Sequence, residues 1–129
     1  MSARIEALAD RLAGVDRLVE IGIGRRPHLA AALVDRGCAV VATDVHERQV
    51  PDGVRFARDD VTDPDLTVYA GADVIYALNL PPELHRPALE VAREVGADLG
   101  FTTLGGDSPL IPVERESLPD DTLFWSRRE

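Results

Sequence analysis

Two glycines and an aspartate carry the clearest chemical meaning in this sequence. Gly22 and Gly24 follow the mainly apolar run 18–21, and Asp44 stands twenty residues after Gly24, at the end of the apolar run 39–43. Glycine lacks a Cβ, so the chain can turn sharply there and a ligand can approach the backbone closely. An aspartate at the tip of the next strand is placed to accept hydrogen bonds from ribose hydroxyls. The spacing predicts a nucleotide-cofactor site, with a purely structural tight turn as the alternative.

Position 27 bears on which nucleotide is bound. A dinucleotide fingerprint has a third glycine here, which allows close packing of helix on strand and seats the pyrophosphate. This chain has Pro27 instead, which counts against NAD. Arg25 and Arg26 precede it at the expected start of a helix, where guanidinium groups and backbone amides can hold an anion or a cofactor carboxylate. Solvated surface arginines are the alternative.

Strands and helices alternate along the chain in a way that positions these residues. Near-continuous apolar strands indicate a parallel sheet covered on both faces. Helices are predicted over 3–13, from Pro27 to a stop at Gly37, and over 82–95, with strands over 18–21, 39–43, 54–57, 73–78 and 98–103. Residues 58–72 are expected to hold at most one short helical turn.

The carboxyl-terminal segment changes character after Gly105-Gly106-Asp107. Residues 110–113 and 122–125 are expected to form an antiparallel hairpin, in which Pro112 marks an edge or bulged strand. We therefore predict an α/β fold, a doubly wound Rossmann-like three-layer sandwich with strand order 3-2-1-4-5 plus this hairpin. Ligands should bind over the carboxyl ends of strands one to four.

Composition limits the protein to a few classes. The 129 residues, 45% of them hydrophobic, suit one domain over 1–129 and leave no room for a separate substrate domain. The net charge is −9 and all 14 basic residues are arginine, which makes non-specific nucleic-acid binding unfavourable. An acidic, lysine-free surface resembles proteins from salt-rich cytoplasms and predicts a fold stabilised by molar KCl. No apolar stretch has membrane-spanning length, so we expect a cytoplasmic protein.

The remaining reactive side chains do not indicate further chemistry. Cys38 is the only cysteine, which fits a reducing compartment, and its apolar surroundings favour a small buried hydrophobe over a nucleophile. His46 and Glu47 follow Asp44 but lack metal-ligand spacing, so no metal site is predicted. His28 and His85 fall on expected helices, as surface or packing residues.

The segment Glu20-x-Gly22-x-Gly24 resembles motif I of S-adenosylmethionine-dependent methyltransferases, in which an acidic residue ends the first strand before a glycine turn. The resemblance implies that these three residues hold the cofactor. It also implies that Asp44, with its neighbour Val45, binds the ribose hydroxyls.

The same resemblance continues after the third strand. It implies that the Asp60 carboxylate contacts the adenine amino group and that the Val61 backbone amide is read by the adenine ring. Asn79-Leu80-Pro81-Pro82 is similar to the Asn/Asp-Pro-Pro-aromatic motif of amino-group methyltransferases, with Leu80 inserted and Glu83 in place of the aromatic residue. Asn79 would then orient the methyl acceptor, whereas the alternative is a strand end followed by prolines that start a helix.

Over nearly its whole length the chain resembles an uncharacterised, mainly archaeal protein family (UPF number 146) of small Rossmann-like proteins related in fold to methyltransferases. The residues that carry this resemblance are 19–27, 42–45, 59–61, 76–84 and 102–107. It implies the fold, and the motifs above indicate S-adenosylmethionine as the cofactor, with the acceptor and turnover left open. The alternatives are a non-catalytic nucleotide-sensing module, a subunit of a homo-oligomer or larger assembly, and an NAD(P)-binding protein.

Overall fold

A seven-stranded mixed sheet forms the centre of the protein, of which a computed structural model describes residues 2–128. The strands are β1 (Arg17–Glu20), β2 (Ala39–Asp44), β3 (Arg55–Arg58), β4 (Val74–Ala77), β5 (Asp98–Phe101), β6 (Glu114–Leu118) and β7 (Asp121–Ser126). Their order is β3-β2-β1-β4-β5-β7-β6, with β1 to β5 parallel and β7 antiparallel to both neighbours. The predicted order 3-2-1-4-5 with an antiparallel hairpin is confirmed.

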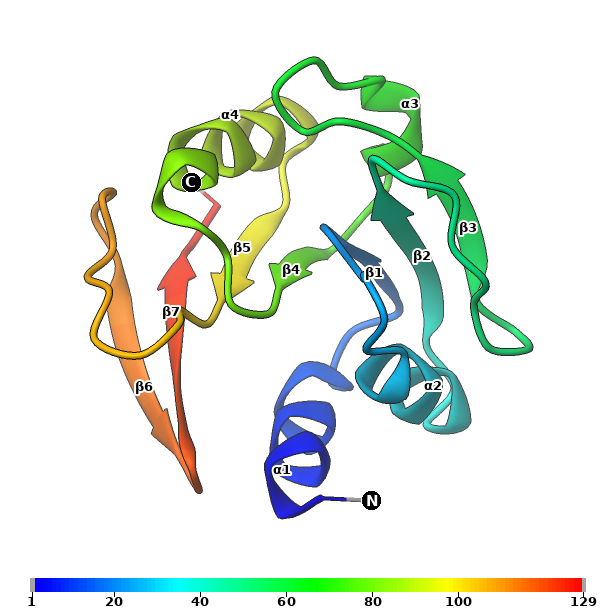
Figure 1. Ribbon diagram of the computed structural model, residues 1–129, viewed down its shortest axis with the longest axis horizontal. Coiled ribbons are helices and arrows are strands. Elements are labelled where there is room, and N and C mark those ends of the chain that lie inside the picture. Colours follow the sequence, from blue (N-terminus) through cyan, green and yellow to red (C-terminus); the bar gives the residue numbers. More distant parts are fainter. Residues whose placement is uncertain (1, 129) are drawn as a thin grey trace.

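Helices cover both faces of this sheet (Figure 1). One side carries α1 (Ala3–Leu12) and α2 (His28–Asp35), and the other carries α3 (Leu66–Tyr69), the 3-10 turn η1 (Pro82–Leu84) and α4 (His85–Val95). Within residues 2–128, no helix is long and apolar enough to cross a membrane.

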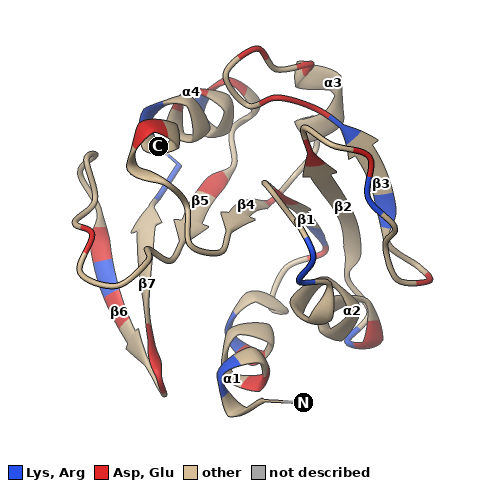
Figure 2. Ribbon diagram, in the orientation of Figure 1, with Lys and Arg blue, Asp and Glu red and all other residues tan. Residues whose placement is uncertain are grey.

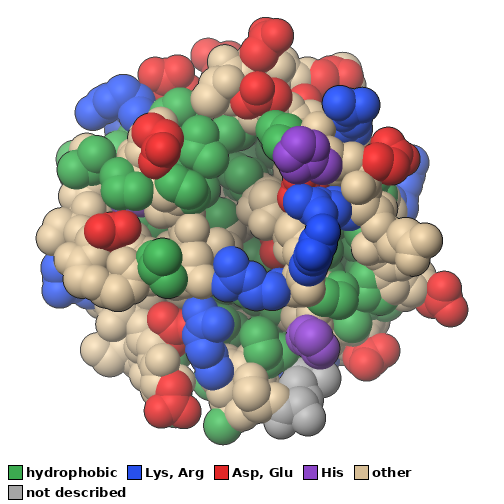
Figure 3. Space-filling view, viewed as in Figure 1, with side chains coloured by type: hydrophobic (Ala, Val, Ile, Leu, Met, Phe, Trp, Pro, Cys, Tyr) green, Lys and Arg blue, Asp and Glu red, His purple; other side chains and the backbone are tan. Residues whose placement is uncertain are grey.

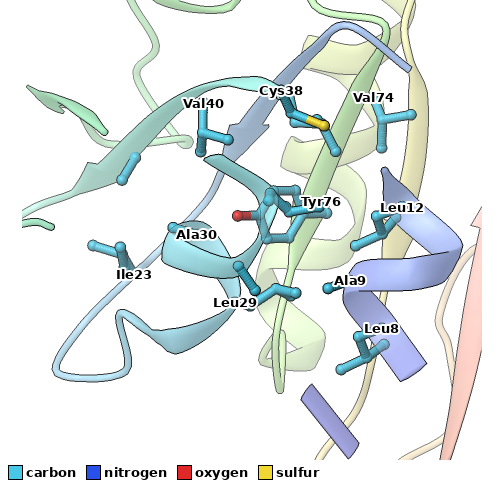
Figure 4. Packing of buried hydrophobic residues seen from close by; sticks show 14 of the residues in the cluster. Leu8, Ala9, Leu12, Ile23, Leu29, Ala30, Cys38, Val40, Val74 and Tyr76 are labelled. Carbon is cyan, nitrogen blue, oxygen red and sulfur yellow. The ribbon is translucent and has the colours of Figure 1, made fainter. Parts of the chain in front are cut away.

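Strand alternation divides the apolar residues into two cores. Leu18 and Tyr76 face α1 and α2, whereas Val19 and Ile75 face α3 and α4. In Figure 4 the Tyr76 ring lies among side chains from both helices and the neighbouring strands. The motif residues therefore sit at the ends of strands that are fixed from both sides.

The hairpin differs from the sequence prediction in its first strand. Residues 110–113 lie in a loop, and the strand is formed by 114–118, so the prediction for this segment was wrong. Pro112 has no N–H to donate to a ladder, and the polar segment 114–118 suits an outer edge strand because charged side chains discourage further pairing. The turn has only Pro119 and Asp120 between the paired residues, and Asp120 adopts a φ of +66°.

Gly100 gives a test of the β5–β7 packing. A Cβ added there would lie 2.9 Å from Cζ3 of Trp125. The Trp125 indole N–H donates a hydrogen bond to Glu116. The guanidinium groups of Arg11 and Arg127 also lie over the Trp125 ring. The ring has little freedom to move aside, so we predict that Gly100→Ala lowers the free energy of unfolding by about 1–3 kcal/mol. Guanidinium unfolding followed by circular dichroism measures this.

Gly14→Ala is the matched control, since a Cβ there meets nothing within 4 Å. Its unfolding free energy should stay within about 0.5 kcal/mol of the parent. Equal losses in the two variants would contradict the packing described for Trp125.

Candidate functional site

A cleft of about 350 Å³ opens at the carboxyl ends of β1, β2, β3 and β4, on the side of the sheet that carries α3 and α4. This volume lies within the range of small-molecule sites, roughly 300–1,000 Å³. The residues that line it are Ile21, Gly22, Arg26, Thr43, Asp44, Val45, Asp59, Asp60, Val61, Leu78, Asn79, Leu80, Pro81 and Leu84. Four chain segments far apart in sequence thus meet at one edge.

Six of the eight residues predicted from the sequence line this cleft. They are Gly22, Asp44, Val45, Asp60, Val61 and Asn79. Parallel strands bring these residues together because their carboxyl ends all point to the same edge of the sheet. The other two predicted residues, Glu20 and Gly24, do not line the cleft.

Asp44 connects the end of β2 to the glycine turn after β1. Its Oδ2 accepts a hydrogen bond from the Gly24 amide at 2.8 Å, its Oδ1 accepts one from the His46 amide at 3.0 Å, and Arg48 Nε lies 3.5 Å from Oδ1. Burial alone would raise the pKa of Asp44, but these two amides and the Arg48 charge outweigh it and hold the pKa below its ordinary value. Asp44 is therefore ionised at neutral pH and holds the turn in place.

The glycine turn itself depends on left-handed backbone. Gly22 has φ +69° and Gly24 φ +55°, a conformation that glycine adopts without a steric penalty. A Cβ at Gly22 would meet nothing within 4 Å, so the requirement there is conformational and not one of space. The Gly24 amide is already used by Asp44, which makes Gly24 part of the frame beneath the cleft.

Glu20 lies on the opposite side of the sheet from the cleft. Its side chain is 1% exposed, and its Oε1 accepts a hydrogen bond from the Tyr76 hydroxyl at 2.7 Å. Burial raises the pKa of Glu20 to about 7, although the Tyr76 hydrogen bond and the Arg26 charge act to lower it. The Glu20 backbone carbonyl accepts from Thr43 Oγ1 at 2.9 Å, which joins the ends of β1 and β2. The Glu20 side chain therefore braces the strand that leads into the glycine turn.

The loop after β3 places two adjacent aspartates at the cleft. Asp59 accepts from the hydroxyl of the fully buried Tyr69 and from the Asp65 amide. Asp60 is exposed, and its Oδ1 accepts both the amide and the hydroxyl of Thr62. These two hydrogen bonds hold the pKa of Asp60 below its ordinary value. Asp59 was not predicted, because its partner Tyr69 is fixed by the packing of α3 and not by any local pattern.

Asn79 lies in the cleft wall that follows the end of β4. Its φ of +51° is left-handed, and its amide donates to Thr102 Oγ1 at 2.8 Å. The next amide, Leu80, donates to the Thr102 carbonyl at 2.9 Å. The chain at Asn79 is thus held against the end of β5 in a conformation that asparagine tolerates better than most residues.

His85 holds the other end of this segment. Its Nδ1 accepts from the Leu110 amide at 3.1 Å, so the neutral ring carries its proton on Nε2 and donates to the Leu80 carbonyl at 3.0 Å. The ring is fully buried, so of the surface and packing roles expected for His85 from the sequence, the structure shows the packing role. Pro82 starts η1, in agreement with the alternative that the prolines begin a helix.

Charge around the cleft is mixed. Arg26 lines it, whereas Arg25 does not. On the face shown in Figure 3, arginine, histidine and acidic side chains are interspersed. Within residues 2–128, no group of three His, Cys, Asp or Glu side chains is arranged to hold a metal ion. Cys38 is buried, and burial raises its thiol pKa, as suits an unreactive packing residue.

Glu20 makes stability depend on pH. In an unfolded chain its pKa is near 4.5 and in the fold about 7, so between these values the native state keeps a proton that the unfolded state has lost. The titration of Glu20 leaves the free energy of unfolding unchanged below pH 4.5 and lowers it by up to about 3 kcal/mol as the pH rises to 7. Glu20→Gln should therefore gain stability relative to the parent over this interval, as measured by denaturant unfolding at a series of pH values.

Glu90→Gln removes the same charge at an exposed position on α4 and is the control for the loss of one carboxyl group. A Glu20→Gln difference in stability that does not change with pH would mean that Glu20 is not protonated in the native state near neutral pH.

Solved structures of similar fold include several methyltransferases. An RNA methyltransferase of Salinibacter ruber in complex with S-adenosyl-L-homocysteine matches with a TM-score of 0.64 and 21% identity, over 92% of this chain and 88% of that chain. Magnesium protoporphyrin IX methyltransferase of Synechocystis with bound S-adenosylmethionine gives 0.64 and 13%, over 95% and 74%. A candidate zinc-dependent alcohol dehydrogenase of Rhodobacter sphaeroides gives 0.60 and 20%, over 83% and 48%, so the fold alone does not distinguish the two activities.

Sequence relatives identify a narrower group. A UPF0146 protein of Halobacterium salinarum is 54% identical over 117 residues, which are 90% of this chain and 91% of that protein. A UPF0146 protein of Archaeoglobus fulgidus is 52% identical over 91 residues, 70% of each chain. The model of the uncharacterised protein family UPF0146 matches residues 3–128. This chain is therefore a member of the UPF0146 family, with a methyltransferase-like fold.

Proposed function

We propose that this protein binds S-adenosylmethionine in the cleft at the carboxyl ends of β1 to β4 and presents its methyl group to an acceptor beside Asn79. The observation that carries the proposal is the convergence of Gly22, Asp44, Asp60 and Asn79, from four separate strand ends, on one cleft of about 350 Å³. Similarity to methyltransferases whose structures hold S-adenosylmethionine or S-adenosyl-L-homocysteine adds support from the fold.

The cleft residues divide into an adenosine end and a carboxylate end. Asp60 is exposed and ionised, so it can accept from an adenine amino group, with the neighbouring Val61 backbone beside the ring. Asp44 still has lone pairs for a ribose hydroxyl, since each carboxylate oxygen accepts more than one hydrogen bond. Arg26 is the cationic cleft residue and suits the cofactor carboxylate.

Glu20 has a different role in this proposal from the one its motif implies. It is buried behind β1 and bonded to Tyr76, so it positions the glycine turn without touching the cofactor. The turn has no third glycine, and Pro27 takes the N-cap position of α2 without a side-chain cap. Both features favour S-adenosylmethionine over a dinucleotide, because the third glycine of a dinucleotide fingerprint lets the helix pack closely on the strand and seats the pyrophosphate.

Transfer from this cofactor requires positioning more than acid–base help. When bound, S-adenosylmethionine supplies a sulfonium-activated methyl group. Asn79 lies on the cleft wall, and the Thr102 hydrogen bond fixes its backbone. Its amide side chain and the Leu80-Pro81 backbone would orient the acceptor's nucleophilic atom toward the methyl carbon.

Isothermal titration calorimetry in molar KCl tests the binding step. S-adenosyl-L-homocysteine and S-adenosylmethionine should bind with one site per chain, whereas NAD and NADP should show no measurable heat. The proposal fails if NAD or NADP binds and neither adenosyl compound does.

Asp60→Asn is the sharpest variant for the same assay. Asparagine keeps the acceptor for Thr62 but loses the charge that strengthens a hydrogen bond from the adenine amino group, so affinity should fall roughly 10-fold. Asp63→Asn is the control, because Asp63 is exposed on the same turn but does not line the cleft. Equal effects of the two variants would remove Asp60 from the adenine site.

Asp44→Ala does not separate loss of cofactor binding from loss of structure in the glycine turn. It would leave the amides of Gly24 and His46 without their acceptor and Arg48 without its carboxylate, so lost binding and a disordered turn would look alike.

A further inference from the structure

A groove of about 480 Å³ lies over the amino-terminal halves of β1, β2 and β3, at the opposite end of these strands from the cleft. Its floor includes Val19 and Val41, on the side of the sheet that α3 and α4 cover. Val68 and Ala57 add apolar surface beside them, and both are only partly buried. Val41 is also partly buried although β2 is an interior strand.

The groove exists because the crossover from β3 to β4 carries almost no helix. Parallel strands are usually joined by a helix that covers the sheet between them. Here α3 has four residues, a length of about 6 Å. Its Tyr69 packs into the core beneath it and α3 contacts α4, which leaves the starts of β2 and β3 partly exposed beside the buried Val19 of β1 (Figure 1).

The charges on the groove are all positive. Arg17 and Arg55 are its two charged residues, both are exposed, and no Asp or Glu lines it, in a chain with 23 acidic residues. Among the described residues, neither guanidinium takes part in a salt bridge. Figure 2 shows acidic positions over most other elements, whereas β3 carries basic positions at its ends.

We propose that this groove is a docking site for an acidic amphipathic helix of a partner protein. The apolar face of that helix would cover Val41, Ala57 and Val68, in the place of the missing crossover helix. Glutamate or aspartate side chains on its flanks would pair with Arg17 and Arg55. A second copy bound groove to groove is disfavoured, because two-fold symmetry would bring these arginines against one another. Docking here leaves the cleft open, so the proposal does not depend on the cofactor.

Fluorescence anisotropy with synthetic peptides tests the proposal on the full chain, at the lowest KCl concentration that keeps it folded by circular dichroism. The probe is a labelled helix of about 18 residues, roughly 27 Å long, with a Leu and Ala face flanked by glutamates. A second peptide has lysine at each glutamate. We expect the glutamate peptide to bind at least about 10-fold more tightly, and more weakly as KCl screens the charges.

The double variant Arg17→Glu with Arg55→Glu should reverse this preference in favour of the lysine peptide, with the circular dichroism spectrum of the folded chain unchanged. Arg86→Glu with Arg93→Glu, which alters net charge equally on α4, should leave the glutamate preference intact.

The proposal is overturned if neither peptide binds at about 1 mM, or if both bind equally. It is also overturned if the α4 pair abolishes the preference as effectively as the groove pair. Sedimentation velocity distinguishes a second copy as the occupant. If the parent is a dimer and the double variant Arg17→Glu with Arg55→Glu is a monomer, the groove binds a second copy instead.

Discussion

The Asp44 carboxylate is the constraint on which the cleft depends. One oxygen holds the glycine turn through the Gly24 amide, and the other holds the loop after β2 through the His46 amide, with Arg48 beside it. Hydrogen bonds to an ionised group are worth about 1.5–3 kcal/mol each, enough to fix a turn made of flexible residues. Because the turn and the end of β2 are neighbours at one sheet edge, this single side chain sets the shape of the cleft floor.

Two buried tyrosines brace the strands that surround this point. Under α2, the Tyr76 hydroxyl donates to Glu20 at the end of β1, and on the opposite side Tyr69 donates to Asp59 at the end of β3. Each tyrosine provides a hydrogen bond to a carboxyl group that packing would otherwise leave poorly solvated. Ligand-facing groups such as Asp60 are left on the solvent side. The sheet edge that forms the cleft is thus held in place although the crossover after β3 contains only the short helix α3.

The sequence predicted the sheet order and the location of the cleft, because both follow from alternation of apolar strands with helices and from glycine and aspartate at strand ends. Glu20 shows where motif resemblance was insufficient. It shares strand parity with Leu18, which places its side chain on the α2 face, and the hydroxyl that binds it comes from a strand 56 residues away. The apolar run 110–113 predicts a strand one segment too early, because the edge strand β6 over 114–118 needs no apolar run. The links made by His85 and Asp59 depend on tertiary packing that no local pattern specifies.

The central claim, that the cleft of β1 to β4 binds S-adenosylmethionine, is tested most directly by amide chemical-shift mapping. A ¹⁵N-labelled sample in molar KCl would be titrated with S-adenosyl-L-homocysteine. The account predicts saturable shifts concentrated at Gly22, Val45, Val61 and Asn79, with the groove residues Val41 and Ala57 unchanged. Saturable shifts that avoid these cleft amides, or none at millimolar ligand, would contradict it.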